Sequence, residues 1–257
     1  MKVFDAYSDY YDLLYQDKNY GKEVDYIDTL MKQYSKEAEA ILELGSGTGL
    51  HACLLAKLGY TIHGIDRSDT MLKKAIERQN GLEESVAQRL SFNKGDICNY
   101  QSSKKYDAAI SLFHVMSYME TNEMLMQAIN TAKSHIKPNG LFIFDCWHGP
   151  AVLADRPISR TKIFENDTMY VKRVSNPEIH VEKNLVDVNF DILIENKKSD
   201  GKTTLQESHK MRYLFPEELT TLLNKAGFSL LHSEEWISKN PLSENTWNAC
   251  YICKKQS

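Results

Sequence analysis

From residue 40 to residue 147 the chain alternates between short apolar runs and longer amphipathic stretches. The runs have the length of buried strands, and the stretches carry apolar residues at the spacing of one helix face. Strands that alternate with helices predict a parallel sheet covered by helices on both faces. The expected strands are 40–44, 61–66, 90–97, 106–113 and 141–147. The expected helices are 48–59, 68–80 and 121–137.

After Pro150 the pattern changes to long, β-branched and partly alternating segments with no helix between them. The segments 162–175, 180–198 and 202–215 therefore predict a small antiparallel sheet inserted into the parallel fold. The sequence Ser-Asp-Gly at residues 199–201 predicts a hairpin turn between the last two segments.

The C-terminal part is expected to return to the main sheet. A helix at 216–227 has proline in its first turn and glycine past its end. The strands 228–237 and 246–255 have no helix between them, so we expect them to pair antiparallel. We thus predict one α/β domain with a doubly wound, mostly parallel seven-stranded sheet whose last strand is antiparallel. Its parts are an aromatic N-terminal helical lid at 1–40, a βα core at 41–150, the inserted sheet at 151–215 and the return to the core at 216–257.

Charge and hydropathy exclude several classes of protein. The net charge of −4 disfavours a general nucleic-acid binder or a protein of anionic membrane surfaces. No apolar run approaches the roughly 18 residues that span a bilayer. The first twelve residues carry three aspartates where a signal peptide has an apolar core, so we expect a cytoplasmic protein.

Five cysteines are scattered along the chain, which fits reduced thiols better than a disulfide framework. Cys250 and Cys253 form a C-x-x-C pair, but they lie in an expected strand, where residues three apart point to opposite faces. We interpret both as small buried residues and expect no metal site.

A glycine-rich turn, ELGSGTG at residues 43–49, follows the first strand, and Asp66 ends the second strand. Such a turn lets the backbone approach a ligand, and an acid at that strand end accepts hydrogen bonds from ribose hydroxyls. The unit suits an adenosine-containing cofactor, either a nicotinamide dinucleotide or S-adenosylmethionine. Residues 47–52 fit the dinucleotide pattern G-x-G-x-x-A, although that register starts two residues into the turn.

The second kind of cofactor explains more of the chain. ELGSGTG resembles the E/D-x-G-x-G-x-G signature of class I S-adenosylmethionine-dependent methyltransferases, and matched elements follow at GIDRS, GDI, 107–119 and 137–145. The resemblance implies S-adenosylmethionine as cofactor and S-adenosylhomocysteine as product. It implies cofactor contacts from Glu43, Gly45, Ser46, Gly47, Gly49, Asp66, Arg67, Met71, Gly95, Asp96, Ile97, Leu112 and Phe113.

The aromatic segment before the core is similar to the lid of small-molecule N-methyltransferases, including amino-sugar N,N-dimethyltransferases. Residues 145–150 and 207–210 resemble that subfamily's E-P-W-W-F-P and E-S-H-R, whereas residues 246–249 lack the arginine of its S-G-R-G. The resemblance adds cofactor contacts from Tyr11, Lys18 and Tyr20, and acceptor contacts from Tyr15, Trp147 and His209.

The predicted reaction is transfer of a methyl group to a small-molecule amine, such as that of an amino sugar. Positioning the amine in line with the methyl group supplies most of the rate enhancement and lowers the barrier by about 7–11 kcal/mol. His114 and His148 are candidates to orient the acceptor or take its proton, because ligands gather at the carboxyl ends of parallel strands. The resemblance adds Tyr118 as a third candidate, at the position where some of those N-methyltransferases carry a histidine near the amine. Other histidines, among them His51, His63 and His135, are interpreted as surface or half-buried residues.

Four other functions fit parts of the pattern. The first is an O-methyltransferase of a sugar or metabolite hydroxyl. The second is a glycine-type N-methyltransferase, which needs an arginine for the acceptor carboxylate. The third is an NAD(P)-dependent oxidoreductase. The fourth is a non-catalytic binding protein with the same fold. The exposed edges of the inserted sheet could also pair two copies into a homodimer.

Overall fold

The structure is a computed structural model that describes residues 13–15, 18–198 and 201–257. Its helices are α2 (Tyr20–Tyr34), α3 (Leu50–Lys57), α4 (Asp69–Asn80), α5 (Glu84–Ala87), η1 (Val115–Tyr118), α6 (Asn122–His135), α7 (Gly149–Ala154), η2 (Val181–Lys183) and α8 (Pro216–Ala226). Its strands are β1 (Ala40–Leu44), β2 (Thr61–Asp66), β3 (Leu90–Lys94), β4 (Tyr106–Ser111), β5 (Ile136–His148), β6 (Arg160–Glu165), β7 (Met169–His180), β8 (Leu185–Asn196), β9 (Lys202–Leu214), β10 (Phe228–Glu235) and β11 (Asn248–Lys255).

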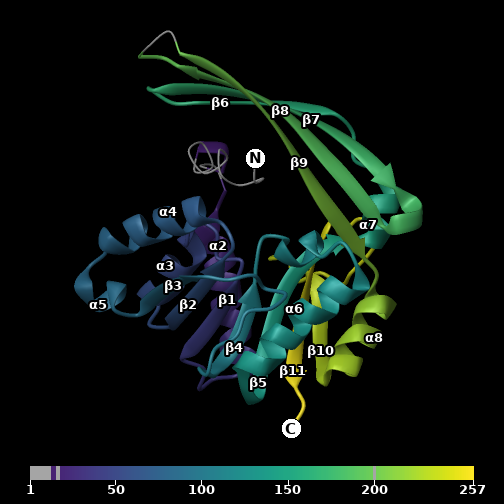
Figure 1. Cartoon of the computed structure of the whole chain (residues 1–257). Helices are drawn as coiled ribbons and strands as arrows, with labels where there is room; N and C mark the ends of the chain where they lie inside the picture. Colours follow the sequence, from purple (N-terminus) through teal and green to yellow (C-terminus); the bar gives the residue numbers. More distant parts are fainter. Residues whose placement is uncertain (1–12, 16–17, 199–200) are drawn as a thin grey trace.

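Five parallel strands and the two C-terminal strands form the central sheet (Figure 1). β1 lies between β2 and β4, and β3 and β5 extend the parallel set on either side. β11 pairs antiparallel with both β5 and β10. The predicted mostly parallel sheet with an antiparallel last strand is confirmed.

The two faces of this sheet bury different residues of the same strands. Leu42, Phe142 and Cys253 belong to a core shared with α6 and α8. Ile41, Ile143 and Cys250 belong to a second core, shared with α2 and α3. Alternate residues of a strand point to opposite faces, so each strand supplies both cores. The two cysteines of the C-x-x-C pair therefore lie in different cores, as the sequence predicted.

The inserted sheet is a four-stranded antiparallel meander, β6–β9, that stands over the top of the core (Figure 1). The prediction of a single strand over residues 162–175 is wrong, because the chain turns inside this segment and forms the two strands β6 and β7. The side chain of Asn166 accepts hydrogen bonds from the N–H groups of Thr168 and Met169, at 2.9 and 2.8 Å, and this local bonding favours a turn.

β9 joins the two sheets. Its outer part pairs with β8, and its last residues pair parallel with the end of β5, Tyr213 opposite Trp147 and Leu214 opposite His148. The inserted sheet is thereby fixed over the carboxyl ends of the central strands, which is the edge where doubly wound folds bind ligands.

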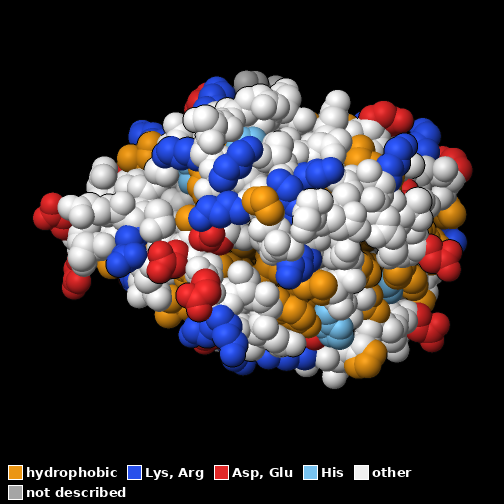
Figure 2. Space-filling view, turned by 90° about the horizontal axis from the view of Figure 1, so that it is seen from below, with side chains coloured by type: hydrophobic (Ala, Val, Ile, Leu, Met, Phe, Trp, Pro, Cys, Tyr) orange, Lys and Arg blue, Asp and Glu red, His pale blue; other side chains and the backbone are white. Residues whose placement is uncertain are grey.

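The opposite end of the molecule carries many lysine and arginine side chains (Figure 2). Among the lysines at this end, Lys105 and Lys255 donate to carbonyls at the end of α6, those of Ser134, Lys133 and Ile136. Basic groups at a helix C-terminus satisfy its last carbonyls and complement its dipole, so these two lysines have a structural explanation. Within the described residues, no helix is both long and apolar enough to span a membrane.

Candidate functional site

The turn after β1 is held open by its glycines. Gly45, Gly47 and Gly49 have φ values of +76°, +53° and +71°, in the left-handed region that only glycine adopts at little cost. The N–H groups of Gly45 and Ser46 both donate to the carbonyl of Ile65, at 2.9 Å, and tie the turn to β2. A Cβ atom on Gly47 would meet no atom within 4 Å, so the turn has an open side at this residue.

The glycines predict a contrast in stability. A Cβ atom on Gly49 would lie 2.8 Å from the Phe92 ring and 2.9 Å from Ala75. We expect Gly49→Ala to lower the free energy of unfolding by about 3 kcal/mol, from left-handed backbone strain plus overpacking. Gly47→Ala adds no clash and should cost only about 1 kcal/mol. Urea unfolding of the two variants measures both, and equal losses would contradict this description of the turn.

Asp66 closes the turn from the end of β2. One carboxylate oxygen accepts from the N–H of Gly47 and the other from the N–H of Ser68, each at 2.9 Å. Burial raises the pKa of Asp66, and these two hydrogen bonds act in the opposite direction. Ser68, not Asp66, is the N-cap of α4, since its hydroxyl accepts from the N–H of Met71. The carboxylate thus joins the glycine turn to the N-cap of α4.

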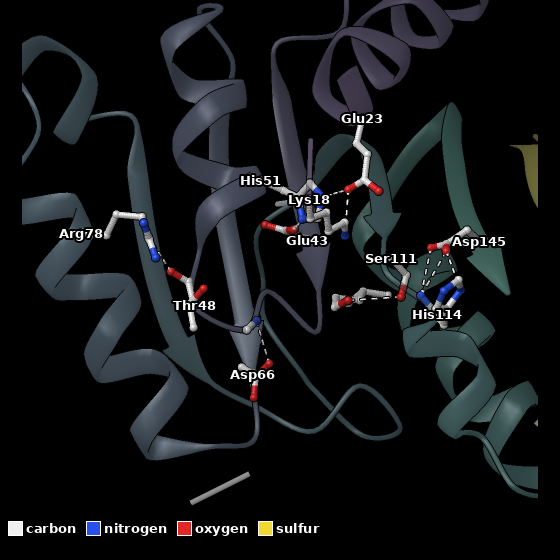
Figure 3. A network of polar contacts seen from close by, with 12 residues as sticks. Lys18, Glu23, Glu43, Thr48, His51, Asp66, Arg78, Ser111, His114 and Asp145 are labelled. Atoms are coloured by element: carbon white, nitrogen blue, oxygen red, sulfur yellow. Dashed lines mark hydrogen bonds and ion pairs between the residues drawn. The ribbon is translucent and has the colours of Figure 1, made fainter. Parts of the chain in front are cut away.

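A second polar group joins the N-terminal segment to the base of α3 (Figure 3). The Lys18 ammonium lies 2.9 Å from Glu23 Oε2, and His51 Nε2 lies 2.7 Å from the same oxygen. Burial alone would raise the pKa of Glu23, but the hydrogen bond from His51 and the charge of Lys18 lower it to about 2. The Lys18 ammonium also lies over the rings of Phe113 and Tyr20, 3.3 and 4.4 Å from their centroids. Glu23 is therefore a fixed anion behind a buried cation.

Glu43 lies beneath this group and is only 1% exposed. Its Oε1 lies 4.0 Å from His51 Nδ1, and its Oε2 has no hydrogen-bond partner among the described residues. Burial, with repulsion from Asp66, raises the pKa of Glu43 to about 8. A buried carboxyl with an unpartnered oxygen is suited to a cationic partner.

The loop after β4 has two consecutive residues with positive φ, Phe113 at 64° and His114 at 63°. Asp145, fully buried on β5, accepts from the N–H of His114 with both oxygens, at 3.2 and 3.1 Å, and lies 2.9 Å from its Nδ1. Non-glycine residues in this region cost energy and persist where their surroundings hold them, often at functional sites. Asp145 is the group that holds this loop (Figure 3).

The inserted sheet covers the site with residues of β8 and β9. Phe190 packs edge-on against His209, with ring centroids 5.3 Å apart. The His209 Nδ1 lies 2.8 Å from the hydroxyl of Tyr118, the last residue of η1. Tyr15 packs edge-on against Phe113, at 5.0 Å. Both sheets and the N-terminal segment therefore meet around the same space.

These elements enclose a cavity of about 290 Å³. Most residues that the sequence assigned to the cofactor or the acceptor line it. They are Tyr15, Tyr20, Gly45, Ser46, Gly47, Asp66, Arg67, Met71, Gly95, Asp96, Ile97, Leu112, Phe113, His114, Tyr118, Trp147 and His209.

Some predicted residues lie elsewhere. His148 is 2% exposed and does not line the cavity, so the structure does not bring it together with His114. Lys18, Glu43 and Gly49 stand behind the lining residues. Tyr11 lies outside the described residues. The interpretation of His51, His63 and His135 as surface or half-buried residues is wrong, since their side chains are all buried.

The sequence missed several residues of the site. His51 lines the cavity, and so do Val188, Phe190 and Met211 of the inserted sheet. Glu23 and Asp145 hold lining residues from behind. The alternation of β8 and β9 could have shown which of their side chains share a face, but not that this face covers the cavity. Among the described residues, no cluster of three or more His, Cys, Asp or Glu side chains could hold a metal ion.

Known proteins share this sequence pattern and this fold. Residues 42–142 match the family described as "Methyltransferase domain". The dTDP-3-amino-3,4,6-trideoxy-alpha-D-glucopyranose N,N-dimethyltransferase of Streptomyces venezuelae is 25% identical over 230 residues, 89% of this chain and 92% of that protein. DesVI of Streptomyces venezuelae has a TM-score of 0.80 at 21% identity, over 97% of this chain and 98% of that one. The sugar N-methyltransferase KedS8 of Streptoalloteichus has a TM-score of 0.79 at 16% identity, over 96% and 93%.

Proposed function

We propose that this chain, a class I S-adenosylmethionine-dependent methyltransferase, methylates the amino group of an amino sugar. The match to a methyltransferase domain and the shared fold support the reaction class. The names of the relatives support the acceptor class. In the chain itself, the main support is that the glycine turn, Asp66, Tyr118 and His209 line one cavity.

The residues at the glycine turn fit the cofactor. Gly47 leaves the space that a side chain would fill, and Asp66 offers a carboxylate at the ribose position. Glu43 has an unpartnered buried oxygen, which suits the positive charge of the amino-acid end. When bound, S-adenosylmethionine supplies a methyl group that is already activated on a sulfonium. The protein's task is therefore to place a nucleophile in line with it.

The acceptor half of the cavity is mostly apolar. Trp147, Val188, Phe190 and Met211 form its walls, and Tyr118 and His209 supply polar atoms. Such walls favour the uncharged, nucleophilic form of an amine, and aromatic faces stabilise the cation that forms. A glycine-type acceptor carboxylate would need an arginine; Arg67 lines the cavity, whereas Arg212 is paired with Glu218. An amine without a carboxylate fits these walls better.

Three cations on the inserted sheet support an acceptor that carries phosphate. Lys162 of β6 stands directly opposite Arg173 of β7, and Arg160 is two residues away on the same face. Like charges in directly opposed positions destabilise a sheet unless an anion joins them. The Arg173 guanidinium lies 4.8 Å from the ring centroid of the cavity residue Phe190, and its buried Nη1 has no hydrogen-bond partner among the described residues. A nucleotide-linked sugar could reach this group despite the missing C-terminal arginine.

This assignment predicts a binding defect confined to phosphate-bearing acceptors. Arg173→Gln should raise KM for a dTDP-linked amino sugar about tenfold, with kcat unchanged, because one charged hydrogen bond is lost from uniform binding. Lys172→Gln, the neighbouring residue on the opposite face, is the matched control. Initial rates with dTDP-linked and free amino sugars measure the effect. An equal KM in wild type and variant would remove the phosphate assignment.

The function is tested in two steps. Calorimetry with S-adenosylhomocysteine, with NAD and NADP in parallel, should give micromolar binding of the first alone. Mass spectrometry then follows methyl uptake by the dTDP-linked amino sugar of the Streptomyces venezuelae relative. N-methyl products support the proposal, and O-methyl products would favour the O-methyltransferase alternative. Binding of NAD alone would favour the NAD(P)-dependent oxidoreductase.

A homodimer stays part of this proposal. β6 is the last strand of the inserted sheet, and within the part of the chain that the structure describes it pairs with β7 alone, so we propose that its other edge pairs with a second copy.

A further inference from the structure

Three side chains run in a line from the acceptor half of the cavity into the inserted sheet. The Tyr118 hydroxyl lies 2.8 Å from His209 Nδ1, and His209 Nε2 lies 3.4 Å from Glu207 Oε2. Glu207 and His209 are two residues apart on β9, so they share one face. Their side chains are 6% and 5% exposed. The Tyr118 hydroxyl thus faces the cavity, the buried His209 imidazole lies next to it, and the buried Glu207 carboxylate lies on the far side of the imidazole.

The chemistry of the groups sets the direction of the hydrogen bonds. An ionised carboxylate only accepts, so the neutral imidazole carries its hydrogen on Nε2, toward Glu207. Nδ1 is then the acceptor, and Tyr118 donates its hydroxyl hydrogen to it. The Tyr118 oxygen keeps the capacity to accept a hydrogen bond, and Tyr118 lines the cavity.

Tyr118 alone is a poor base. Burial raises the pKa of its hydroxyl above the usual range, so the phenol keeps its proton at neutral pH. An acceptor amine that arrives as an ammonium must lose a proton before its lone pair can attack. The imidazole behind the hydroxyl can hold that proton, and the carboxylate behind the imidazole offsets the charge that results.

We propose that Tyr118, His209 and Glu207 form a proton relay for the acceptor amine. This inference rests on the proposed amine methylation. The N–H bond of the ammonium breaks as an O–H bond forms at the Tyr118 oxygen. The original O–H bond of Tyr118 breaks as an N–H bond forms at His209 Nδ1. The imidazolium stands beside Glu207, and its proton returns by the same path to solvent water once the product has left.

The roles of the three residues differ. Tyr118 touches the acceptor, whereas His209 and Glu207 act through it and are positioning residues. Because both lie on β9, the inserted sheet supplies the proton path as well as a wall. Besides Glu207 of the relay itself, the charged and titratable groups around Tyr118 are Tyr15, Arg67 and Asp66. From β8, His209 is faced by Val188 and Phe190, which carry no charge.

The test compares His209→Gln and Glu207→Gln with wild type, using the dTDP-linked amino sugar as acceptor. At pH 7 we expect kcat to fall by about tenfold to a hundredfold in His209→Gln, and less in Glu207→Gln. At a pH of about 9.5 most of the amine is already neutral, so the loss should shrink to within about twofold. His180→Gln is the matched control, since it removes another carboxylate-paired histidine of the inserted sheet, 3.3 Å from Asp187.

A second measurement does not depend on turnover. Nitrogen NMR of the cofactor-free protein should show His209 with hydrogen on Nε2, and a shifted Nδ1 signal in Tyr118→Phe. Unchanged S-adenosylhomocysteine affinity confirms that the variants fold. A rate loss of equal size at both pH values, or hydrogen on Nδ1, would overturn the relay. If the wild-type protein methylates no amine, the proposed function is wrong. The NMR result still tests whether His209 carries its hydrogen on Nε2 and accepts a hydrogen bond from Tyr118.

Discussion

Replacing Asp66 by alanine is expected to weaken S-adenosylhomocysteine binding at least about a hundredfold. The carboxylate is the predicted acceptor for the ribose hydroxyls, and hydrogen bonds to a charged group contribute about 1.5–3 kcal/mol each. It also accepts from the N–H of Gly47, so its loss releases the turn that faces the cofactor. Because the hydrogen bonds to the ribose and the hydrogen bond from Gly47 are both lost, the expected change in affinity is large. Isothermal titration calorimetry measures it directly.

Asp69→Ala is the matched control for this variant. Asp69 is an exposed acid three residues along, paired with Lys94 on the surface. Exposed pairs contribute little, so its affinity should match wild type. If Asp66→Ala binds within about threefold of wild type while its thermal unfolding is unchanged, the ribose assignment is wrong.

Glu43→Gln is expected to make the protein more stable by several kcal/mol at pH 8 and by less than about 1 kcal/mol at pH 5. The pKa of Glu43 is raised to about 8 in the folded protein, above its ordinary value of 4.5, so the folded state holds a proton that the unfolded chain releases. This contribution is fully present below pH 4.5 and is lost as the pH rises through 8. The slope is about 1.4 kcal/mol per pH unit, or about 5 kcal/mol over the whole interval between the two pKa values. Glutamine keeps the shape of the protonated acid and has no proton to lose.

Urea unfolding at a series of pH values gives the difference between the two proteins. Glu39→Gln, an exposed glutamate just before β1, should leave the wild-type pH dependence unchanged. A constant difference between wild type and Glu43→Gln from pH 5 to pH 8 would mean that Glu43 is ionised throughout. The site would then contain a full negative charge before any cationic group binds.

Local patterns made much of the fold predictable from the sequence. The strand 40–44 and the cap at Ser68 follow from apolar runs and from residues whose side chains bond their own backbone. The helix bounded by Pro216 and Gly227 is equally local, because both residues act through their own backbone angles. The turn at Asn166 was missed because a single Asx turn does not interrupt the alternation around it.

The candidate site was predictable where one segment supplies it and unpredictable where distant segments meet. The glycine turn and Asp66 belong to one βαβ unit, so their spacing reveals them. Tyr118 and His209 are 91 residues apart, and their contact exists only because β9 returns to the end of β5. No local signal in the sequence indicates that Glu23 and His51, on two different helices, bury each other's polar atoms.

The attachment of the inserted sheet has a consequence for engineering. The proposed cofactor half of the cavity is lined mainly by the loops after β1, β2 and β3, whereas Val188, Phe190, His209 and Met211 of the proposed acceptor wall belong to β8 and β9. Among the described residues, strand pairing joins the inserted sheet to the central sheet only where the last residues of β9 lie beside β5. Hairpins from related enzymes could therefore be grafted between residues 160 and 212 to change which acceptor is accepted, while the donor half keeps its own geometry. Acceptor range and donor use in this architecture are free to evolve separately.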